Sequence, residues 1–242
     1  MKKLLLLTSL AAIAASTAFA AGHGETVRMG TEGAYPPYNF LNDAGEVDGL
    51  EREVGDEVCK RAELTCEWVT NDWDSIIPNL VSGNYDTIIA GMSITAERDE
   101  VIDFTQNYVP PVPSAFLAPV GTTDLSEAVI AAQTGTIQAG YIASTGATLL
   151  EFASPDETIA AVRNGEVDAV LADKDFLTPF AEESADLELV GEEVSLGGGI
   201  GIGVRESDPE LKAKLDAAIQ SMKDDGTLNA LIEKWLPGSA LF

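Results

Sequence analysis

The chain has 242 residues, with 14 Lys and Arg against 40 Asp and Glu, and a formal net charge of −26. A surface this acidic repels nucleic acid and anionic membranes, so neither is expected as a partner. Hydrophobic residues make up 45% of the sequence, which is ordinary for a globular protein and argues against intrinsic disorder.

The first 20 residues have the composition of a secretory signal peptide. Lys2 and Lys3 form a charged segment, Leu4–Ala15 is apolar, and Ala18 and Ala20 are small residues of the kind a signal peptidase reads. We therefore expect cleavage near Ala20 and a periplasmic mature protein. A retained N-terminal anchor is the alternative, and no later segment approaches the roughly 20 apolar residues that a membrane span needs.

Short β-rich runs then alternate with amphipathic helical runs, a pattern typical of α/β folds with mainly parallel sheets. The predicted strands are Val27–Thr31, Cys66–Thr70, Thr87–Ala90, Ser114–Ala118, Val129–Gln133, Val167–Ala172 and Ile200–Val204.

Helical periodicity and capping signals predict the helices between these strands. Leu50, Val54 and Val58 recur every four residues, as one helix face requires. A second helix is predicted over Asp74–Val81, with its apolar residues facing inward. Two further starts carry a Ser cap, a Pro in the first turn and a nearby Glu, and they lie at Ser154–Glu157 and Ser207–Glu210. The last of these helices is expected to bury Leu211, Leu215, Ile219 and Met222, before a turn and a final helix over Leu228–Leu236.

Two segments are predicted to cross between lobes. Three prolines in Tyr108–Pro113 favour extended backbone, and Gly197–Gly199 precedes a strand. We expect residues 21–110 and 192–242 to form a discontinuous first lobe and residues 111–191 a second one. The glycine cluster does not match the dinucleotide-binding motif, and a strand rather than a helix follows it.

Cys59 and Cys66 are the only cysteines, and in an exported protein they are expected to form a disulfide. Two buried thiols are the alternative. The single histidine, His23, lies near the start of the mature chain, which argues against a metal site and against histidine-dependent catalysis. No catalytic residue, metal or cofactor is therefore predicted.

A buried strand over Thr87–Ala90 ends in a turn, and a short helix begins after Thr95. Ligands of open α/β sheets bind at such carboxyl ends of strands. Arg98 lies one turn into this helix, and its planar guanidinium matches a carboxylate. The alternative is that Arg98 pairs with Asp99 or Glu100.

Two further turns carry groups that suit a charged ligand. Thr136 follows the strand that ends at Gln133, and its hydroxyl and the free N–H groups there suit an anion. Asp173 ends the strand that begins near Val167, where an acid is costly unless it is paired, and a ligand ammonium is one partner. The alternatives are that both residues simply cap the helices that follow.

Six segments, in this order, resemble the family-3 extracellular solute-binding proteins of polar amino-acid ABC transporters. They are GTEGAYPPYNF (Gly30–Phe40), GLE (Gly49–Glu51), DWDSIIP (Asp72–Pro78), GMSITAER (Gly91–Arg98), QTGT (Gln133–Thr136) and VDAVLAD (Val167–Asp173). The resemblance covers nearly the whole mature chain. It implies a two-lobed periplasmic binding protein fold of type II, each lobe a mainly parallel sheet flanked by helices. The cysteine spacing also resembles the disulfide of the lysine/arginine/ornithine-binding branch.

The resemblance implies a set of ligand contacts. Arg98, the region of Ser93 with Met92, and Thr136 would hold the α-carboxylate, while Asp173 and the Gly91 carbonyl would hold the α-ammonium.

The same resemblance places further residues around the ligand side chain. Tyr35 and Trp73 would flank it, and Glu32 and Glu51 would lie near its far end. The sequence departs from the basic-ligand branch at Ala90 and Gly91, where serines are common, and at Ile137, where a Thr is frequent. Two polar contacts are therefore lost or made by backbone.

Acids and aromatic faces suit a cationic side chain, so arginine, ornithine, lysine, histidine or an opine are the leading ligands. A neutral side chain such as that of glutamine, or acids that face solvent, are the alternatives. The expected partner is a membrane permease, and the protein is expected to be a monomer. An enzyme similar to cyclohexadienyl dehydratase and a ligand-sensing module remain as alternative functions on the same fold.

Overall fold

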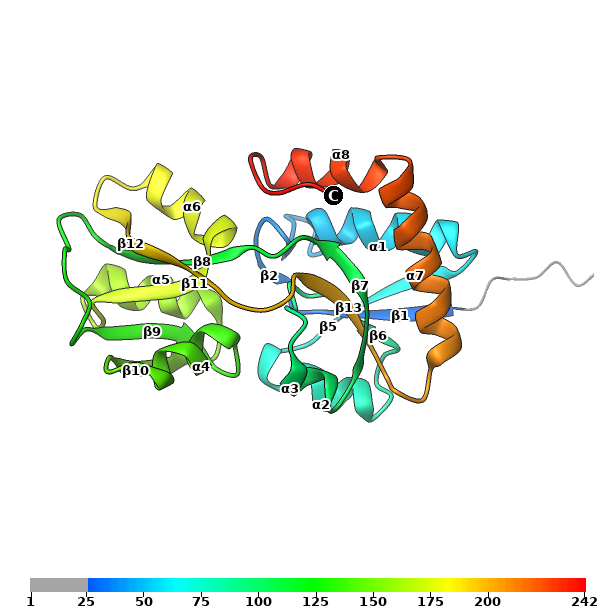
Figure 1. The fold of residues 1–242 in the computed structure, drawn as a ribbon, viewed down its shortest axis with the longest axis horizontal. Helices are drawn as coiled ribbons and strands as arrows, with labels where there is room; N and C mark the ends of the chain where they lie inside the picture. The colour runs from blue at the N-terminus through cyan, green and yellow to red at the C-terminus, as the bar shows by residue number, and fades with distance from the viewer. Residues whose placement is uncertain (1–25) are drawn as a thin grey trace, which may run out of the picture.

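The computed structural model describes residues 26–242, so the predicted signal peptide over residues 1–20 and its cleavage near Ala20 lie outside the described residues. In the described part of the chain, no helix combines the length and apolarity needed to cross a membrane. Figure 1 shows two α/β lobes side by side, joined by two extended segments.

The first lobe is built on a five-stranded sheet with the order β5-β1-β6-β13-β7. Its strands are β1 (Thr26–Thr31), β5 (Thr65–Thr70), β6 (Thr87–Ile88), β7 (Asp103–Val109) and β13 (Ile200–Val204). β1 runs parallel to β5 and β6, whereas β13 is antiparallel to β6 and β7. A small antiparallel sheet of β2 (Ala34–Tyr35), β3 (Asn39–Leu41) and β4 (Val47–Asp48) lies beside it.

Helices pack on this sheet and close its core. They are α1 (Leu50–Arg61), a 3-10 turn η1 (Trp73–Ser75), α2 (Ile76–Val81), α3 (Ala96–Asp99), α7 (Pro209–Asp224) and α8 (Thr227–Trp235). The helices α1, α7 and α8 share one buried apolar cluster with β1 and β13. The C-terminal helices therefore return to the first lobe, as Figure 1 shows.

The second lobe has a five-stranded sheet with the order β10-β9-β11-β8-β12. Its elements are β8 (Pro113–Pro119), β9 (Val129–Gln133), α4 (Ile137–Ser144), β10 (Thr148–Phe152), α5 (Pro155–Asn164), β11 (Ala169–Asp173), α6 (Lys174–Glu183) and β12 (Leu187–Ser195). β9 is parallel to β10 and β11, and β8 is antiparallel to β11 and β12. Each sheet is thus mixed, because one strand in each, β13 in the first sheet and β8 in the second, runs against the other four.

The two crossings lie between β7 and β8 and between β12 and β13. The crossing back to the first lobe comes later than the predicted boundary at residue 191, because β12 still pairs with β8 at Val194 and Ser195. The pairing of β12 with β8 is irregular between Val190 and Val194, and it resumes at Val194 in a shifted register.

The helix-start signals were confirmed at one site and corrected at the other. Ser154 caps α5 in a full capping box with Glu157. The cap of α7 is Asp208 rather than Ser207, since Pro209 takes the first helical position. Val81 was predicted to face inward, but it ends α2 with 53% of its surface exposed.

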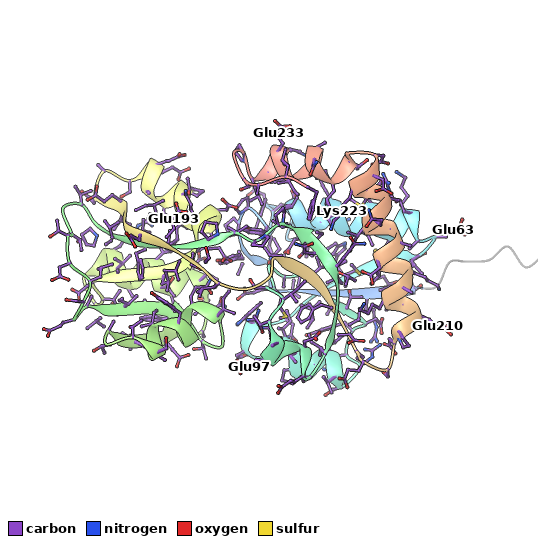
Figure 2. The ribbon with its side chains drawn as sticks, viewed as in Figure 1. Glu63, Glu97, Glu193, Glu210, Lys223 and Glu233 are labelled. Carbon is purple, nitrogen blue, oxygen red and sulfur yellow. A yellow bond between two sulfur atoms is a disulfide. The ribbon has the colours of Figure 1, made fainter. Side chains whose placement is uncertain are left out.

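Cys59 and Cys66 form the predicted disulfide, with 6.1 Å between their Cα atoms. It joins the last turn of α1 to the start of β5. The acidic composition lies at the surface: Figure 2 shows side chains such as Glu63, Glu97 and Glu233 on the outside of the molecule, and all three are exposed.

Candidate functional site

The site is a cavity between the lobes, at the carboxyl ends of β1 and β6 in the first sheet and of β9 and β11 in the second. Eight of the ten predicted ligand-binding residues line it, namely Glu32, Tyr35, Trp73, Gly91, Ser93, Arg98, Thr136 and Asp173. The structure thus brings together residues that are far apart in the sequence, and it does so because strand ends of both sheets face one another.

Arg98 lies at the first-lobe side of the cavity. The Thr95 hydroxyl caps α3 by accepting the Arg98 N–H at 3.2 Å, which fixes where this side chain emerges. The guanidinium donates to the Ser93 carbonyl at 2.9 Å and to the Gly135 carbonyl at 3.4 Å, and it lies 5.3 Å from the Trp73 ring centroid.

The charge of this guanidinium is offset at longer range by Asp173 and Glu97. Among residues 26–242 it makes no ion pair, so the alternative pairing with Asp99 or Glu100 does not occur. Burial lowers the pKa of Arg98 to about 10, which leaves it charged at neutral pH. A charge held this way at a cavity wall suits an anion such as a carboxylate.

Thr136 faces Arg98 from the second lobe. It caps α4, accepting the Ala139 N–H at 3.2 Å and donating to the Gln133 carbonyl at 2.7 Å. The capping role proposed as the alternative for Thr136 is therefore present, and the residue lines the cavity as well.

Asp173 lies at the end of β11 and is 7% exposed. Its carboxylate accepts from the Tyr35 hydroxyl at 3.1 Å and from Gln138 Nε2 at 2.9 Å, and it makes no capping hydrogen bond to α6. Burial raises the pKa of Asp173 to about 6. Desolvation of a carboxylate without a cation is costly, so a positively charged group in the cavity would stabilise it.

Glu32 is a second acid on the cavity wall. Glu32 accepts from Gln133 Nε2 at 2.5 Å, and the same amide donates to the Ala153 carbonyl at 3.1 Å. Burial, together with the charges of Asp72, Glu51 and Asp156, raises the pKa of Glu32 to about 7. In the described chain Glu32 makes no ion pair.

Gln133 and Phe176 are among the lining residues that were not predicted as ligand contacts. Gln133 ends β9 inside the QTGT segment, and its position at a carboxyl strand end was a usable signal. Phe176 stacks on Tyr35 with 4.3 Å between centroids and 13° between planes. Nothing in the sequence distinguished Phe176 from an ordinary core residue of α6.

Glu51 and Met92 do not line the cavity, which corrects their expected positions. Met92 is fully buried and packs with Ile76 and Leu80 under the sheet, because neighbouring residues of an extended turn point to opposite sides. Glu51 is also fully buried, and its carboxylate bonds to protein groups beneath the cavity, including the Gly91 N–H.

Two α/β lobes that meet on a cavity, with Arg98 on one wall and Asp173 on the other, are the architecture of the periplasmic binding proteins, a class that works by hinge closure. The model of the bacterial extracellular solute-binding proteins, family 3, matches residues 27–238, and the chain belongs to this family.

Known proteins support this assignment over nearly the full chain. A periplasmic His/Glu/Gln/Arg/opine family-binding protein from Silicibacter pomeroyi, solved in complex with lysine, is 71% identical and superposes with a TM-score of 0.88, covering 89% of this chain and 100% of that one. The putative ABC transporter arginine-binding protein 2 of Escherichia coli K12 is 29% identical, over 97% of this chain and 99% of its own. An ancestral amino acid-binding protein, a precursor of cyclohexadienyl dehydratase, is 28% identical with a TM-score of 0.79, over 87% and 95% of the two chains.

Proposed function

We propose that this protein is the periplasmic substrate-binding component of an ABC transporter, and that its ligand is an α-amino acid with a basic side chain. The observation that carries the proposal is the placement of Arg98 and Asp173 on opposite lobes of one cavity, each without an oppositely charged ion-pair partner in the described chain.

In this proposal the ligand's α-carboxylate pairs with Arg98 and its α-ammonium pairs with Asp173. A zwitterion reaches both only when the lobes are closed, so binding and closure are coupled. Closure also excludes water, which strengthens both charge-assisted hydrogen bonds. Thr136 and the turn at Gly91 and Ser93 contribute further polar contacts to the two charged groups.

The ligand side chain then extends toward Glu32. The ring faces of Tyr35 and Trp73 contact its aliphatic part, and the Glu32 carboxylate pairs with a terminal cation. The side-chain oxygen of Gln133 can also accept a hydrogen bond from this cation, once Glu32 pairs with the cation in place of the Gln133 amide. The lysine bound in the Silicibacter pomeroyi protein supports a basic ligand for this chain.

We further propose that the protein binds without turnover. Dehydration of a cyclohexadienyl substrate needs an acid poised to protonate a leaving group. Glu32 has a raised pKa, but the Arg98 and Asp173 pair favours a retained zwitterion. The chain is proposed to act as a monomer that delivers its ligand to a membrane permease.

The test is isothermal titration calorimetry of the mature protein, unfolded and refolded to remove carried-over ligand, with lysine, arginine, ornithine, histidine, glutamine and norleucine. We expect lysine or another basic amino acid to bind most tightly, and Glu32→Gln to reduce this preference over norleucine. Tighter binding of glutamine would keep amino-acid binding and refute the cationic pocket. Binding of no amino acid, together with turnover of prephenate or arogenate, would support the enzyme instead.

A further inference from the structure

Glu51 is the most deeply buried acid close to the cavity, and it does not line that cavity. It lies in the first turn of α1. Its Oε1 accepts the Gly91 N–H at 2.6 Å and the Tyr108 hydroxyl in a short hydrogen bond, and its Oε2 accepts Asn39 Nδ2 at 2.7 Å. None of the basic residues in the described chain forms an ion pair with it.

Through Asn39 the Glu51 carboxylate is also linked to the turn at Gly33, which is part of the cavity wall. Asn39 Oδ1 accepts the Gly33 N–H at 2.7 Å. Gly33 follows Glu32 and comes two residues before Tyr35, so its turn sets the directions of two cavity side chains. Gly91 lies in the other turn, two residues before Ser93, which also lines the cavity.

Both glycines have backbone angles in the left-handed region, with φ of 74° at Gly33 and 63° at Gly91. Such turns are easily adopted by glycine, but glycine also has many other accessible conformations. A side chain that bonds to both N–H groups, directly or through one amide, removes this freedom. Glu51 therefore links the two glycine turns into one unit.

Tyr108 connects this unit to the crossing between the lobes. It is the penultimate residue of β7, and the chain leaves the first lobe directly after Val109. The tyrosine is fully buried, so its hydroxyl needs a partner inside the protein, and Glu51 supplies it.

The hydrogen-bond pattern fits an ionised carboxylate. Burial raises the pKa of Glu51, while the bonds from Tyr108, Gly91 and Asn39 each lower it. All three neighbours donate, which a carboxylate accepts without an unpaired hydrogen. A neutral amide of the same shape has one acceptor oxygen instead of two and would leave a buried donor unpaired.

We propose that Glu51 is a positioning residue for the ligand site. Without touching the ligand, it holds the Gly33 and Gly91 turns in the geometry in which Glu32, Tyr35 and Ser93 contact the ligand. The inference rests on the proposed amino-acid binding and assigns a role to a residue beneath that same cavity.

The test compares Glu51→Gln with the wild-type protein in two titrations, one with lysine and one with norleucine, which lacks the terminal cation. We expect both dissociation constants to rise by at least tenfold, because both ligands use the turns that direct Tyr35 and Ser93, and that of lysine to rise further because only lysine pairs with Glu32. The Gly91 amide proton resonance, followed by NMR in the ligand-free protein, should move upfield when its carboxylate acceptor is lost. Glu53→Gln is the matched control, since Glu53 lies on the same helix and pairs with Lys234 at the surface, and it should change neither constant more than twofold.

Three outcomes would overturn the proposal. Loss of lysine affinity with norleucine unchanged would make Glu51 a contact of the ligand side chain. A lower melting temperature with both dissociation constants preserved would leave it a purely structural role, and an unchanged Gly91 resonance would refute the bond itself. If Glu51→Gln does not fold, Tyr108→Phe removes one donor to the same oxygen and is expected to weaken the binding of both ligands. A wild-type protein that binds neither amino acid refutes the proposed function instead, while the Gly91 resonance still tests Glu51.

Discussion

The Tyr35 hydroxyl donates to the Asp173 carboxylate at 3.1 Å, and these two residues lie 138 positions apart on opposite lobes. The Tyr35 ring also stacks on Phe176, three residues after Asp173. The two lobes are therefore in direct contact at the cavity wall, and Arg98 and Asp173 lie on opposite sides of the cavity.

Arg98→Ala should reduce amino-acid affinity by at least about 3 kcal/mol, on the order of 100-fold, because the α-carboxylate would be buried without its partner. Calorimetry with lysine measures this loss. Arg163→Ala is the control, since this arginine lies over the Phe180 ring and does not line the cavity. Affinity retained within a few-fold in Arg98→Ala would place the carboxylate anchor elsewhere.

Lysine affinity should rise with pH and level off above about pH 7. The pKa of Glu32 is raised from 4.5 to about 7 in the ligand-free protein, so below that pH a proton must leave before a cation can pair with the carboxylate. One released proton gives at most about a tenfold change per pH unit. Titrations between pH 5.5 and 8, in buffers of different ionisation enthalpy, measure the affinity and the proton release together.

Glu32→Gln should flatten most of this dependence and leave the smaller contribution of Asp173, whose pKa is raised to about 6. In the ligand-free wild type, the raised pKa of Glu32 acts in the opposite direction on folding: the stabilisation is present below pH 4.5 and is lost as pH rises through about 7. A lysine affinity independent of pH in the wild type would contradict the cationic pairing.

Asp175→Ala should weaken every ligand by a similar factor although Asp175 does not line the cavity. Its carboxylate accepts from Tyr38 at 3.2 Å and from Ser239 at 2.9 Å, and both donors belong to the first lobe whereas Asp175 lies in α6 of the second. Losing these bonds costs the closed state about 1 kcal/mol, or roughly fivefold in apparent affinity. Small-angle X-ray scattering should show a larger radius of gyration in the ligand-free variant.

The control for this contact is Glu182→Ala, because Glu182 is an exposed acid on the same helix. Its affinities and its radius of gyration should match the wild type. If Asp175→Ala changed the affinity for lysine but not for norleucine, its effect would not be on closure.

Replacing both cysteines by alanine should lower the free energy of unfolding by about 2.5 kcal/mol, the value expected for so short a loop in the chain-entropy model. Urea unfolding measures it. Lysine affinity should stay unchanged, because the disulfide joins α1 to the start of β5, whereas the cavity lies at the carboxyl ends of the strands. A large loss of affinity in the folded double variant would contradict this separation.

The sequence predicted most of the elements because their signals are local. Strands such as Ile200–Val204 are continuous apolar runs and are buried at every position. The capping box at Ser154 needs only four neighbouring residues. The strands that were missed include β10 and β12, which form the two edges of the second sheet and bury few side chains, so their apolar pattern is weak.

The order of motifs along the chain also placed eight site residues on one cavity, because carboxyl ends of strands are where α/β folds bind ligands. Only the tertiary structure decided which acid faces that cavity: Glu32 lines it, while Glu51 lies beneath it and bonds to Gly91 and Tyr108. The reason is physical, since a motif fixes the identity and the spacing of a residue, whereas the direction of its side chain depends on the donors that distant segments bring to it.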